Sequence, residues 1–88
     1  MPAFVYMMRC ADNSLYTGWT NNLEQRIKKH EAGTGAKYTH AKKAVALVYY
    51  EELADKSAAL KREYAIKQLS KDGKEALVRN FKENKKSL

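Results

Sequence analysis

The sequence predicts an α+β protein in which a small three-stranded antiparallel sheet is flanked by helices, in the order ββαβαα. The chain has 88 residues, 44% of them hydrophobic, and a single proline, as expected for one globular domain with a thin core. Its strand patterns are too few for a doubly wound fold and lack the strand-helix repetition of a parallel sheet. We expect one domain over residues 1–82 and a frayed tail over residues 83–88.

The first two strands are predicted to form a β-hairpin. Residues 4–10 and 15–20 are rich in aromatic, β-branched and methionine residues, and the turn formers of an Ala-Asp-Asn stretch separate them. If the loop has three residues, Tyr6, Tyr16 and Gly18 share one face of the sheet. Gly18 then leaves open space beside the two phenols, and a glycine in a strand often marks the approach of a ligand.

A helix is predicted over residues 22–31. Asn21 and Glu24 have the spacing of a capping box, which marks the start of a helix. Two glycines follow the predicted helix and end it. The next stretch, residues 33–43 (GTGAKYTHAKK), has no apolar period and is interpreted as a basic surface loop.

One more strand and two more helices are predicted for the second half of the chain. Residues 44–51 are mostly apolar and form the third strand. Asp55 can cap a second helix that runs through residue 69. A Lys-Asp-Gly break at residues 71–73 then precedes a third helix at about residues 74–82.

The charge of the chain suits a polyanionic partner. Lys and Arg number 17 against 10 Asp and Glu, a formal net charge of +7. Apolar runs fall far short of the ~20 residues of a membrane span, and no signal-peptide pattern is present, so a cytoplasmic location is expected. The single cysteine, Cys10, can form neither an internal disulfide nor a metal-binding cysteine pair and is expected to be buried.

Two polar groups of the first helix lie beside its apolar stripe. Each residue advances about 100° around a helix, so Arg26 and His30 flank the stripe made by Leu23 and Ile27. The other polar residues fall on the solvent side: Gln25, Lys28 and Lys29. Arg26 and His30 are therefore expected to point toward the sheet.

An acidic residue interrupts the apolar face of the second helix. Glu63 falls among apolar residues of that face: Ala59, Leu60 and Ile66. A carboxylate at such a position must be paired, hydrogen-bonded or bound to a cation, because burying an isolated charge is very costly. Pairing with Lys67 or Arg62 is one reading, and a metal site is the other.

These residues together resemble the GIY-YIG nuclease superfamily. The resemblance rests on Phe4-Val5-Tyr6, Tyr16-Thr17-Gly18, Arg26, His30 and the AALKRE segment that ends at Glu63. The chain is similar to the small stand-alone bacterial members, which are related to the excision-repair incision subunit and to a nuclease subunit that cuts branched DNA. Phe4 stands in place of the glycine of the first triplet, and Thr17 in place of the isoleucine of the second.

The resemblance implies a metal-dependent DNA endonuclease that hydrolyses phosphodiester bonds. Its catalytic residues would be Tyr6, Tyr16, Arg26 and His30, with one tyrosine as general base and Arg26 on the scissile phosphate. Glu63 would hold a divalent metal, Mg²⁺ or Mn²⁺. Because a phenol with a pKa near 10 is a poor base at pH 7, positive charge from Arg9, Arg26 and the metal is expected to favour the phenolate.

Nucleic-acid contacts are expected mainly from the basic loop. The candidate residues are Arg9, Lys37, Tyr38, His40, Lys42, Lys43 and Lys67. The resemblance implies branched, nicked or damaged duplex DNA as substrate, and a protein partner that supplies target recognition, because many relatives carry a companion domain for it. The alternative is a non-catalytic nucleic-acid-binding module on the same scaffold.

Overall fold

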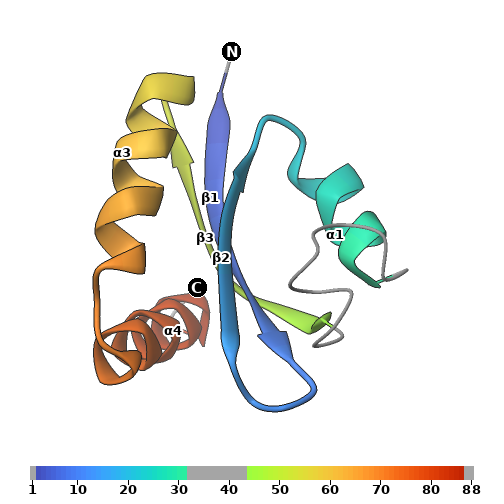
Figure 1. Cartoon of the computed structure of the whole chain (residues 1–88), viewed down its shortest axis with the longest axis vertical. Coiled ribbons are helices and arrows are strands. Elements are labelled where there is room, and N and C mark those ends of the chain that lie inside the picture. The colour runs from blue at the N-terminus through green and yellow to red at the C-terminus, as the bar shows by residue number, and fades with distance from the viewer. Residues whose placement is uncertain (1, 32–43, 87–88) are drawn as a thin grey trace.

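The computed structural model describes residues 2–31 and 44–86 (Figure 1). In chain order the elements are β1 (Ala3–Cys10), β2 (Leu15–Thr20), α1 (Leu23–Glu31), β3 (Ala44–Leu53), α3 (Lys56–Lys67) and α4 (Lys71–Lys86). Within the described residues the strands form one antiparallel sheet in the order β2-β1-β3. The predicted fold class and the order ββαβαα are confirmed. No helix of this described part is long and apolar enough to cross a membrane.

The sheet is covered on both faces, with α3 and α4 on one side and α1 on the other (Figure 1). Side chains alternate between the faces of a strand, so the central strand β1 contributes to two apolar clusters. Val5 and Met7 pack on the α3 and α4 side, in a cluster with Ala59, Ile66 and Val78. Tyr6 and Met8 form the second cluster, against which α1 packs its apolar stripe of Leu23 and Ile27.

The hairpin has the three-residue loop on which the placement of the tyrosines depends. The Cys10 amide donates to the Ser14 carbonyl at 2.9 Å, and the Asn13 amide donates back to the Cys10 carbonyl at 2.9 Å. Asn13 adopts a positive φ of 69°, a conformation that asparagine tolerates better than most residues. The resulting register pairs Tyr6 with Gly18, so the predicted sharing of one face is confirmed.

The first and second helices differ slightly from prediction at their ends. α1 is capped by Asn22, whose Oδ1 accepts from the Gln25 amide at 3.1 Å, so the predicted cap at Asn21 is wrong by one residue. Asp55 caps α3 as predicted, because its Oδ1 accepts from the Ala58 amide at 2.9 Å. α3 ends at Lys67, two residues before the predicted end.

The last helix is longer at both ends than predicted. The residues 71–73, predicted to break the chain, form the first turn of α4 instead. Ser70 Oγ accepts from the Gly73 amide at 3.2 Å and so caps this turn. The helix then continues to Lys86, through most of the stretch expected to fray. The strand β3 is also two residues longer than predicted, since it ends at Leu53.

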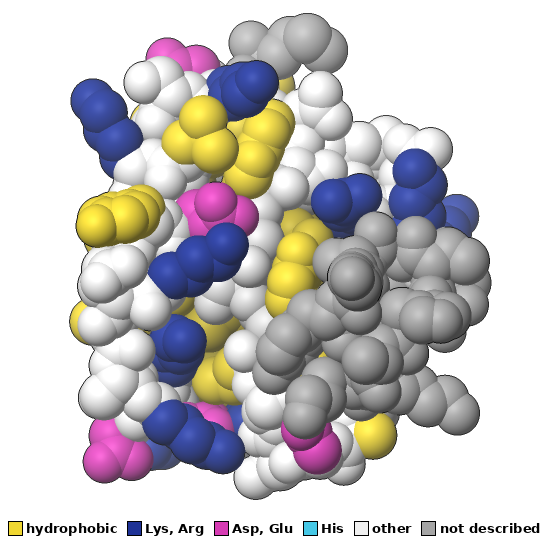
Figure 2. Space-filling model, in the orientation of Figure 1, with side chains coloured by type: hydrophobic (Ala, Val, Ile, Leu, Met, Phe, Trp, Pro, Cys, Tyr) yellow, Lys and Arg dark blue, Asp and Glu magenta, His cyan; other side chains and the backbone are white. Residues whose placement is uncertain are grey.

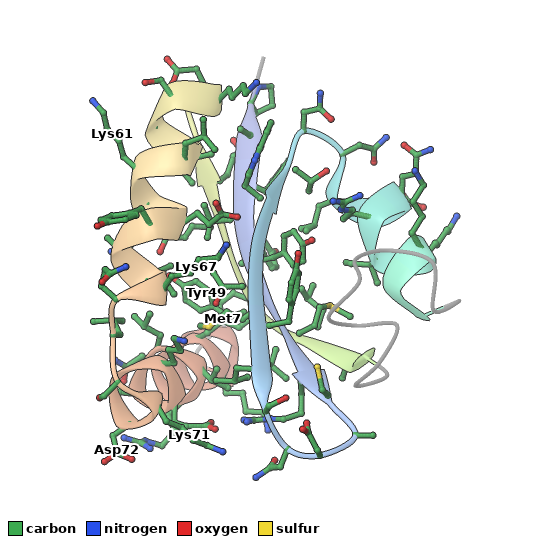
Figure 3. All side chains as sticks on the ribbon, viewed as in Figure 1. Met7, Tyr49, Lys61, Lys67, Lys71 and Asp72 are labelled. Carbon is green, nitrogen blue, oxygen red and sulfur yellow. The ribbon has the colours of Figure 1, made fainter. Side chains whose placement is uncertain are left out.

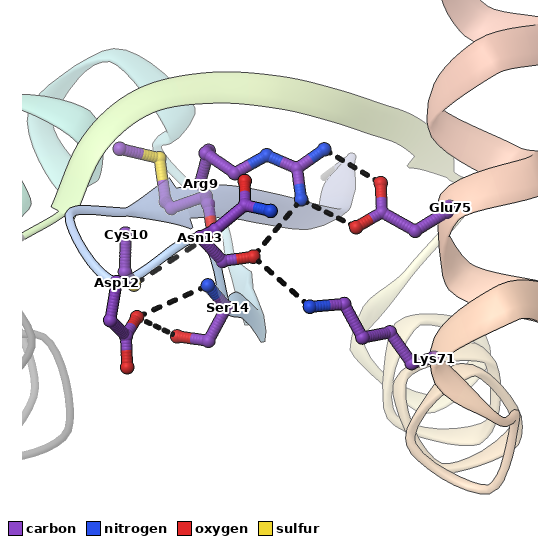
Figure 4. A network of polar contacts seen from close by, with 8 residues as sticks. Arg9, Cys10, Asp12, Asn13, Ser14, Lys71 and Glu75 are labelled. Carbon is purple, nitrogen blue, oxygen red and sulfur yellow. Dashed lines mark hydrogen bonds and ion pairs between the residues drawn. The ribbon is translucent and has the colours of Figure 1, made fainter.

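Polar contacts join the tip of the hairpin to α4 (Figure 4). Arg9 donates from Nη1 to Glu75 Oε2 at 2.6 Å and from Nη2 to Oε1 at 2.7 Å, a bidentate ion pair. Its Nη1 and the Lys71 ammonium both reach the carbonyl of Asn13, at 3.3 and 3.4 Å. These contacts hold β1, β2 and α4 in a fixed relation at one end of the sheet.

Candidate active site

Two tyrosines and a glycine occupy the face of the sheet that α1 covers. The rings of Tyr6 and Tyr16 lie 6.3 Å apart between centroids, tilted by 51°. A Cβ at Gly18 would lie 2.8 Å from the Tyr6 hydroxyl and 3.1 Å from Cε2 of Tyr16. The open space predicted beside Gly18 is therefore filled by the phenols, and any side chain at this position would displace them.

Arg26 reaches the tyrosines from α1. The packing of Leu23 and Ile27 against the Tyr6 cluster fixes the helix, and Arg26, on the flank of that stripe, is half-buried. A hydrogen bond joins its side chain to that of Tyr6. Its Nε is buried and has no hydrogen-bond partner among the described residues. The guanidinium is thus held beside the phenols with donor capacity to spare.

Burial makes both phenols harder to ionise than an exposed tyrosine. Desolvation raises the pKa of Tyr6 to about 12, although the hydrogen bond with Arg26 acts in the opposite direction. Burial also raises the pKa of Tyr16, again against the charge of Arg26. Neither tyrosine can act as a base near pH 7 unless further positive charge reaches the site.

Glu63 approaches the same site from α3, past the edge strand β2. Its charge makes a minor contribution to the raised pKa of both Tyr6 and Tyr16, so the carboxylate lies within electrostatic reach of the two phenols. Its side chain is 17% exposed and lies 3.7 Å from the Lys67 ammonium. Figure 3 shows Lys67 directed from α3 toward the sheet. The carboxylate therefore has the Lys67 ammonium beside it, which agrees with the predicted pairing of Glu63 with Lys67.

The surroundings of Glu63 differ from prediction in two respects. Leu60 is 41% exposed, so it does not belong to the buried face of α3, whereas Ala59 and Ile66 are fully buried. Arg62 does not pair with Glu63, because its Nε donates to both carboxylate oxygens of Glu51 at 2.9 Å. The buried stripe of α3 is therefore narrower than predicted, and Glu63 borders it.

The donor set of the site suits a hard divalent cation. Among the described residues no three His, Cys, Asp or Glu side chains converge, so no ready-made cage of three or more such ligands surrounds Glu63 there. Mg²⁺ keeps several waters and is commonly held by one or two carboxylates together with substrate phosphates. The Glu63 carboxylate is compatible with this mode of Mg²⁺ binding.

Several predicted site residues cannot be placed. His30 lies in α1, but its side chain is outside the described residues. The candidate residues of the basic loop also lie outside them: Lys37, Tyr38, His40, Lys42 and Lys43. Their expected roles stay predictions.

Arg9 does not lie where it was expected. Strand alternation puts residue 9 on the face opposite Tyr6, and there both Nη atoms pair with Glu75. The prediction that Arg9 favours the phenolate is wrong, because this guanidinium faces α4. The sequence already contained this information, because residues 6 and 9 of one strand differ in parity and therefore point to opposite faces of the sheet.

Sequence reasoning also missed a pocket on the α3 and α4 side of the edge strand. It has a volume of about 260 Å³ and is lined by Leu15, Tyr16, Thr17, Lys67 and Lys74. Lys74 was treated only as the start of a helix, and Thr17 only as a departure from a motif. No local pattern brings Thr17 and Lys74 together, because they come from different elements.

The site combines a tyrosine pair on a three-stranded sheet with an arginine from α1 and a glutamate from α3, which are the groups that the resemblance to nucleases predicts. Residues 2–76 match the GIY-YIG catalytic domain. The chain belongs to the GIY-YIG family, a family of nucleases.

Relatives and solved structures resemble the chain over most of its length. The UPF0213 protein CPE1444 of Clostridium perfringens is 53% identical over 75 residues, which are 85% of this chain and 81% of that protein. The UPF0213 protein NP_0776A of Natronomonas pharaonis is 52% identical and covers 85% and 88%. The solution structure of the UPF0213 protein BH0048 from Bacillus halodurans is similar, with a TM-score of 0.58, 43% identity and coverage of 90% and 84%. That of EF2693 from E. faecalis has a TM-score of 0.61, 36% identity and coverage of 92% and 86%.

Proposed function

We propose that the protein is a metal-dependent DNA endonuclease that hydrolyses phosphodiester bonds. The observation that carries this proposal is the convergence of Tyr6, Tyr16, Arg26 and Glu63, which come from four different elements, β1, β2, α1 and α3. Each chemical group needed for phosphodiester hydrolysis is present: a phenol as base, a guanidinium for the phosphate and a carboxylate for a metal.

Arg26 is proposed to bind the scissile phosphate. Its planar guanidinium can bind two phosphate oxygens at once, and its buried Nε lacks a partner among the described residues. A phosphate oxygen accepting from this Nε would satisfy it. The hydrogen bond between Arg26 and Tyr6 would keep the guanidinium in place as substrate arrives.

Tyr16 is the better candidate for the general base. Tyr6 is fully buried and is proposed to position Arg26, whereas Tyr16 is half-buried and can contact water. Glu63 would hold Mg²⁺ or Mn²⁺, and the bound cation would stabilise charge on the phosphate and favour the phenolate. His30 is proposed to assist Tyr16.

The substrate is proposed to be branched, nicked or damaged duplex DNA, in the cytoplasm. The formal charge of +7 and the basic loop at residues 33–43 support a nucleic-acid partner. The kinship to nucleases that act on deformed DNA supports the substrate class. We further propose that a protein partner directs the domain to its target.

A non-catalytic nucleic-acid-binding module is the second candidate. The ion pair between Glu63 and Lys67 favours it, because a carboxylate that is already neutralised has less need of a metal. Such a module would bind DNA with strong salt dependence and release no product in Mg²⁺ or Mn²⁺.

Cleavage and stability measured on the same variants separate the two candidates. The parent is incubated with branched, nicked and plain duplex DNA in each metal, beside Glu63→Gln and, as matched control, Glu52→Gln on the exposed surface of β3. We expect parent and control to cut, and Glu63→Gln to lose about a hundredfold or more in rate.

Thermal unfolding of Glu63→Leu without metal completes the test. Lys67 is 51% exposed, so water can solvate its ammonium once the carboxylate is gone. If the protein is an endonuclease, we therefore expect Glu63→Leu to be as stable as the parent or more stable, as is common where a functional site trades stability for activity. A large loss of stability, together with no product from the parent in either metal, would favour the binding module.

A further inference from the structure

We propose that the pocket beside β2 is a phosphate subsite, which holds a phosphate group of the bound strand next to the one that Arg26 contacts. The inference rests on the proposed function and deepens it. The pocket has a volume of about 260 Å³ and lies between β2, the end of α3 and the first turns of α4. Figure 2 shows Lys and Arg side chains along this seam, with hydrophobic side chains between them.

Thr17 gives the pocket a polar group that lacks a partner. The residue is 4% exposed, and its Oγ1 is buried with no hydrogen-bond partner in the described part of the chain. Burying a hydroxyl without a partner destabilises a fold, so such groups are rare and call for an explanation. A phosphate oxygen in the pocket could accept from this hydroxyl.

The charge of the pocket is positive. Lys67 and Lys74 supply two ammonium groups, and no acidic residue lines the pocket as the structure describes it, although Glu63 pairs with Lys67 from outside the lining. Lys74 is half-buried, and no ion pair of Lys74 is found among the described residues. A buried hydroxyl donor and two cations around an open cavity are the chemistry of an anion site.

The backbone of β2 adds donors at the same place. Antiparallel pairs alternate between hydrogen-bonded and non-bonded positions, and the Cys10–Ser14 pair is hydrogen-bonded. Leu15 and Thr17, one and three positions further, therefore direct their amides away from β1. β2 is an edge strand in the described sheet, so no further strand takes up these amides.

The position of the pocket assigns it to a neighbouring phosphate of the same strand. Tyr16 belongs both to the candidate active site and to the lining of the pocket. Lys67 stands one helical turn, about 5.4 Å, beyond Glu63 on the same face of α3. A phosphate held by Lys67, Lys74 and Thr17 would thus be a near neighbour of the scissile one.

The first test uses Thr17, whose hydroxyl has opposite effects on stability and binding. Thr17→Val keeps the shape but removes the unpartnered hydroxyl, so we expect a higher melting temperature and about tenfold weaker binding of a nicked duplex without metal. Thr17→Ser keeps the hydroxyl and should bind within about twofold of the parent. If Thr17→Val binds as tightly as the parent, the hydroxyl does not contact phosphate and the proposal fails.

The second test uses Lys74 with a control of equal charge. Lys74→Met should weaken binding about tenfold and reduce the salt slope of log K by about 0.9. The control Lys61→Met also removes one positive charge, but from a residue of α3 that points away from the sheet (Figure 3). The DNA affinity of this variant should therefore differ little from that of the parent. Equal losses in both variants would mean that only net charge matters, and would overturn the subsite.

The bound phosphate is identified by neutralising phosphates one at a time. Single methylphosphonate linkages replace internal phosphates near the nick, and a separate duplex lacks the 5′-phosphate at the nick. The change that removes the bound phosphate should weaken binding of the parent but not weaken Lys74→Met further. The subsite is supported if either one internal linkage or the terminal phosphate shows this pattern. It is overturned if removing each phosphate weakens binding of the parent and of Lys74→Met equally. Because binding is measured without cleavage, these results are independent of whether Glu63→Gln loses activity.

Discussion

Tyr6 combines complete burial with a polar role. Burial raises the pKa of its phenol to about 12, while the hydrogen bond with Arg26 opposes this rise. The desolvation effect is the larger of the two, so the net change in the pKa of Tyr6 is upward. A bound cation would oppose desolvation and lower the pKa of the phenol, whereas the negative charge of a phosphate alone would raise it.

Alkaline unfolding tests the raised pKa of Tyr6. An unfolded tyrosine titrates near pH 10, and the folded phenol only near 12. Its contribution to stability is therefore fully present below pH 10 and is lost as the pH rises toward 12. We expect Tyr6→Phe to lose less stability than the parent between pH 9 and 11, measured by denaturant unfolding.

The matched control for Tyr6 is Tyr64→Phe, since Tyr64 is 68% exposed on α3. The free energy of unfolding of this variant should fall with pH as much as that of the parent over the same range. Equal alkaline losses in Tyr6→Phe and the parent would show that the folded phenol of Tyr6 ionises as easily as an unfolded one.

Short-range periodicity predicted many of the site residues. The parity of the hairpin placed Tyr6, Tyr16 and Gly18 on one face, and the helical period placed Arg26 beside the apolar stripe. Whether Leu60 is buried could not be predicted in this way, because the width of the buried face of a helix depends on the sheet that packs against it. The pairing of Arg62 with Glu51 likewise depends on how α3 lies across β3.

Among the elements, the hairpin and α4 are joined by the pair of Arg9 with Glu75. The two residues are 66 positions apart in the chain, so no sequence window contains both. Helix caps, by contrast, are local, and Asp55 was predicted correctly. Asn21 and Asn22 are chemically equivalent candidates, and only the path of the chain after β2 decides between them. Ser70 was overlooked because a glycine three residues later indicated a break.

Glu75→Gln should weaken the attachment of α4 in a pH-dependent way. The pairing with Arg9 lowers the pKa of the Glu75 carboxyl, so its stabilisation is present above the ordinary carboxyl pKa and is lost as the pH falls through the lowered value. At pH 7 we expect a loss of ~1–2 kcal/mol in the free energy of unfolding, since the pair is bidentate but partly exposed. The difference from the parent should shrink below about pH 4.

Glu24→Gln is the matched control for this pair. Glu24 lies 3.6 Å from Lys28 in an i,i+4 pair with both side chains mostly exposed, so its removal should cost no more than ~0.5 kcal/mol at pH 7. A loss for Glu75→Gln as small as that of the control would mean that the Arg9 pair does not hold α4.

For the whole molecule, the formal charge of +7 is spread over the chain, and its use depends on where the cations gather. The described part of the chain has one basic region beside the proposed active site, the pocket with Lys67 and Lys74, and the sequence adds a second basic stretch at residues 33–43, which lies outside the described part. A strand of DNA that crosses the site would need cations on both sides of the scissile phosphate. The pocket would supply cations on one side, and the sequence predicts further phosphate contacts from the loop.

The loop is tested by removing its three lysines together. The variant with Lys37, Lys42 and Lys43 changed to Ala should bind duplex DNA more weakly and reduce the salt slope of log K by about 0.9 for each lost phosphate contact. The control changes Lys61, Arg79 and Lys82, which are exposed on α3 and α4, and lowers the charge of +7 by the same three. Affinity is measured by titration at several salt concentrations without metal. Since both variants carry equal charge, a larger loss of DNA affinity in the loop variant would show that the loop contacts DNA. Equal salt slopes of log K in the two variants would show that the loop makes no phosphate contacts of its own.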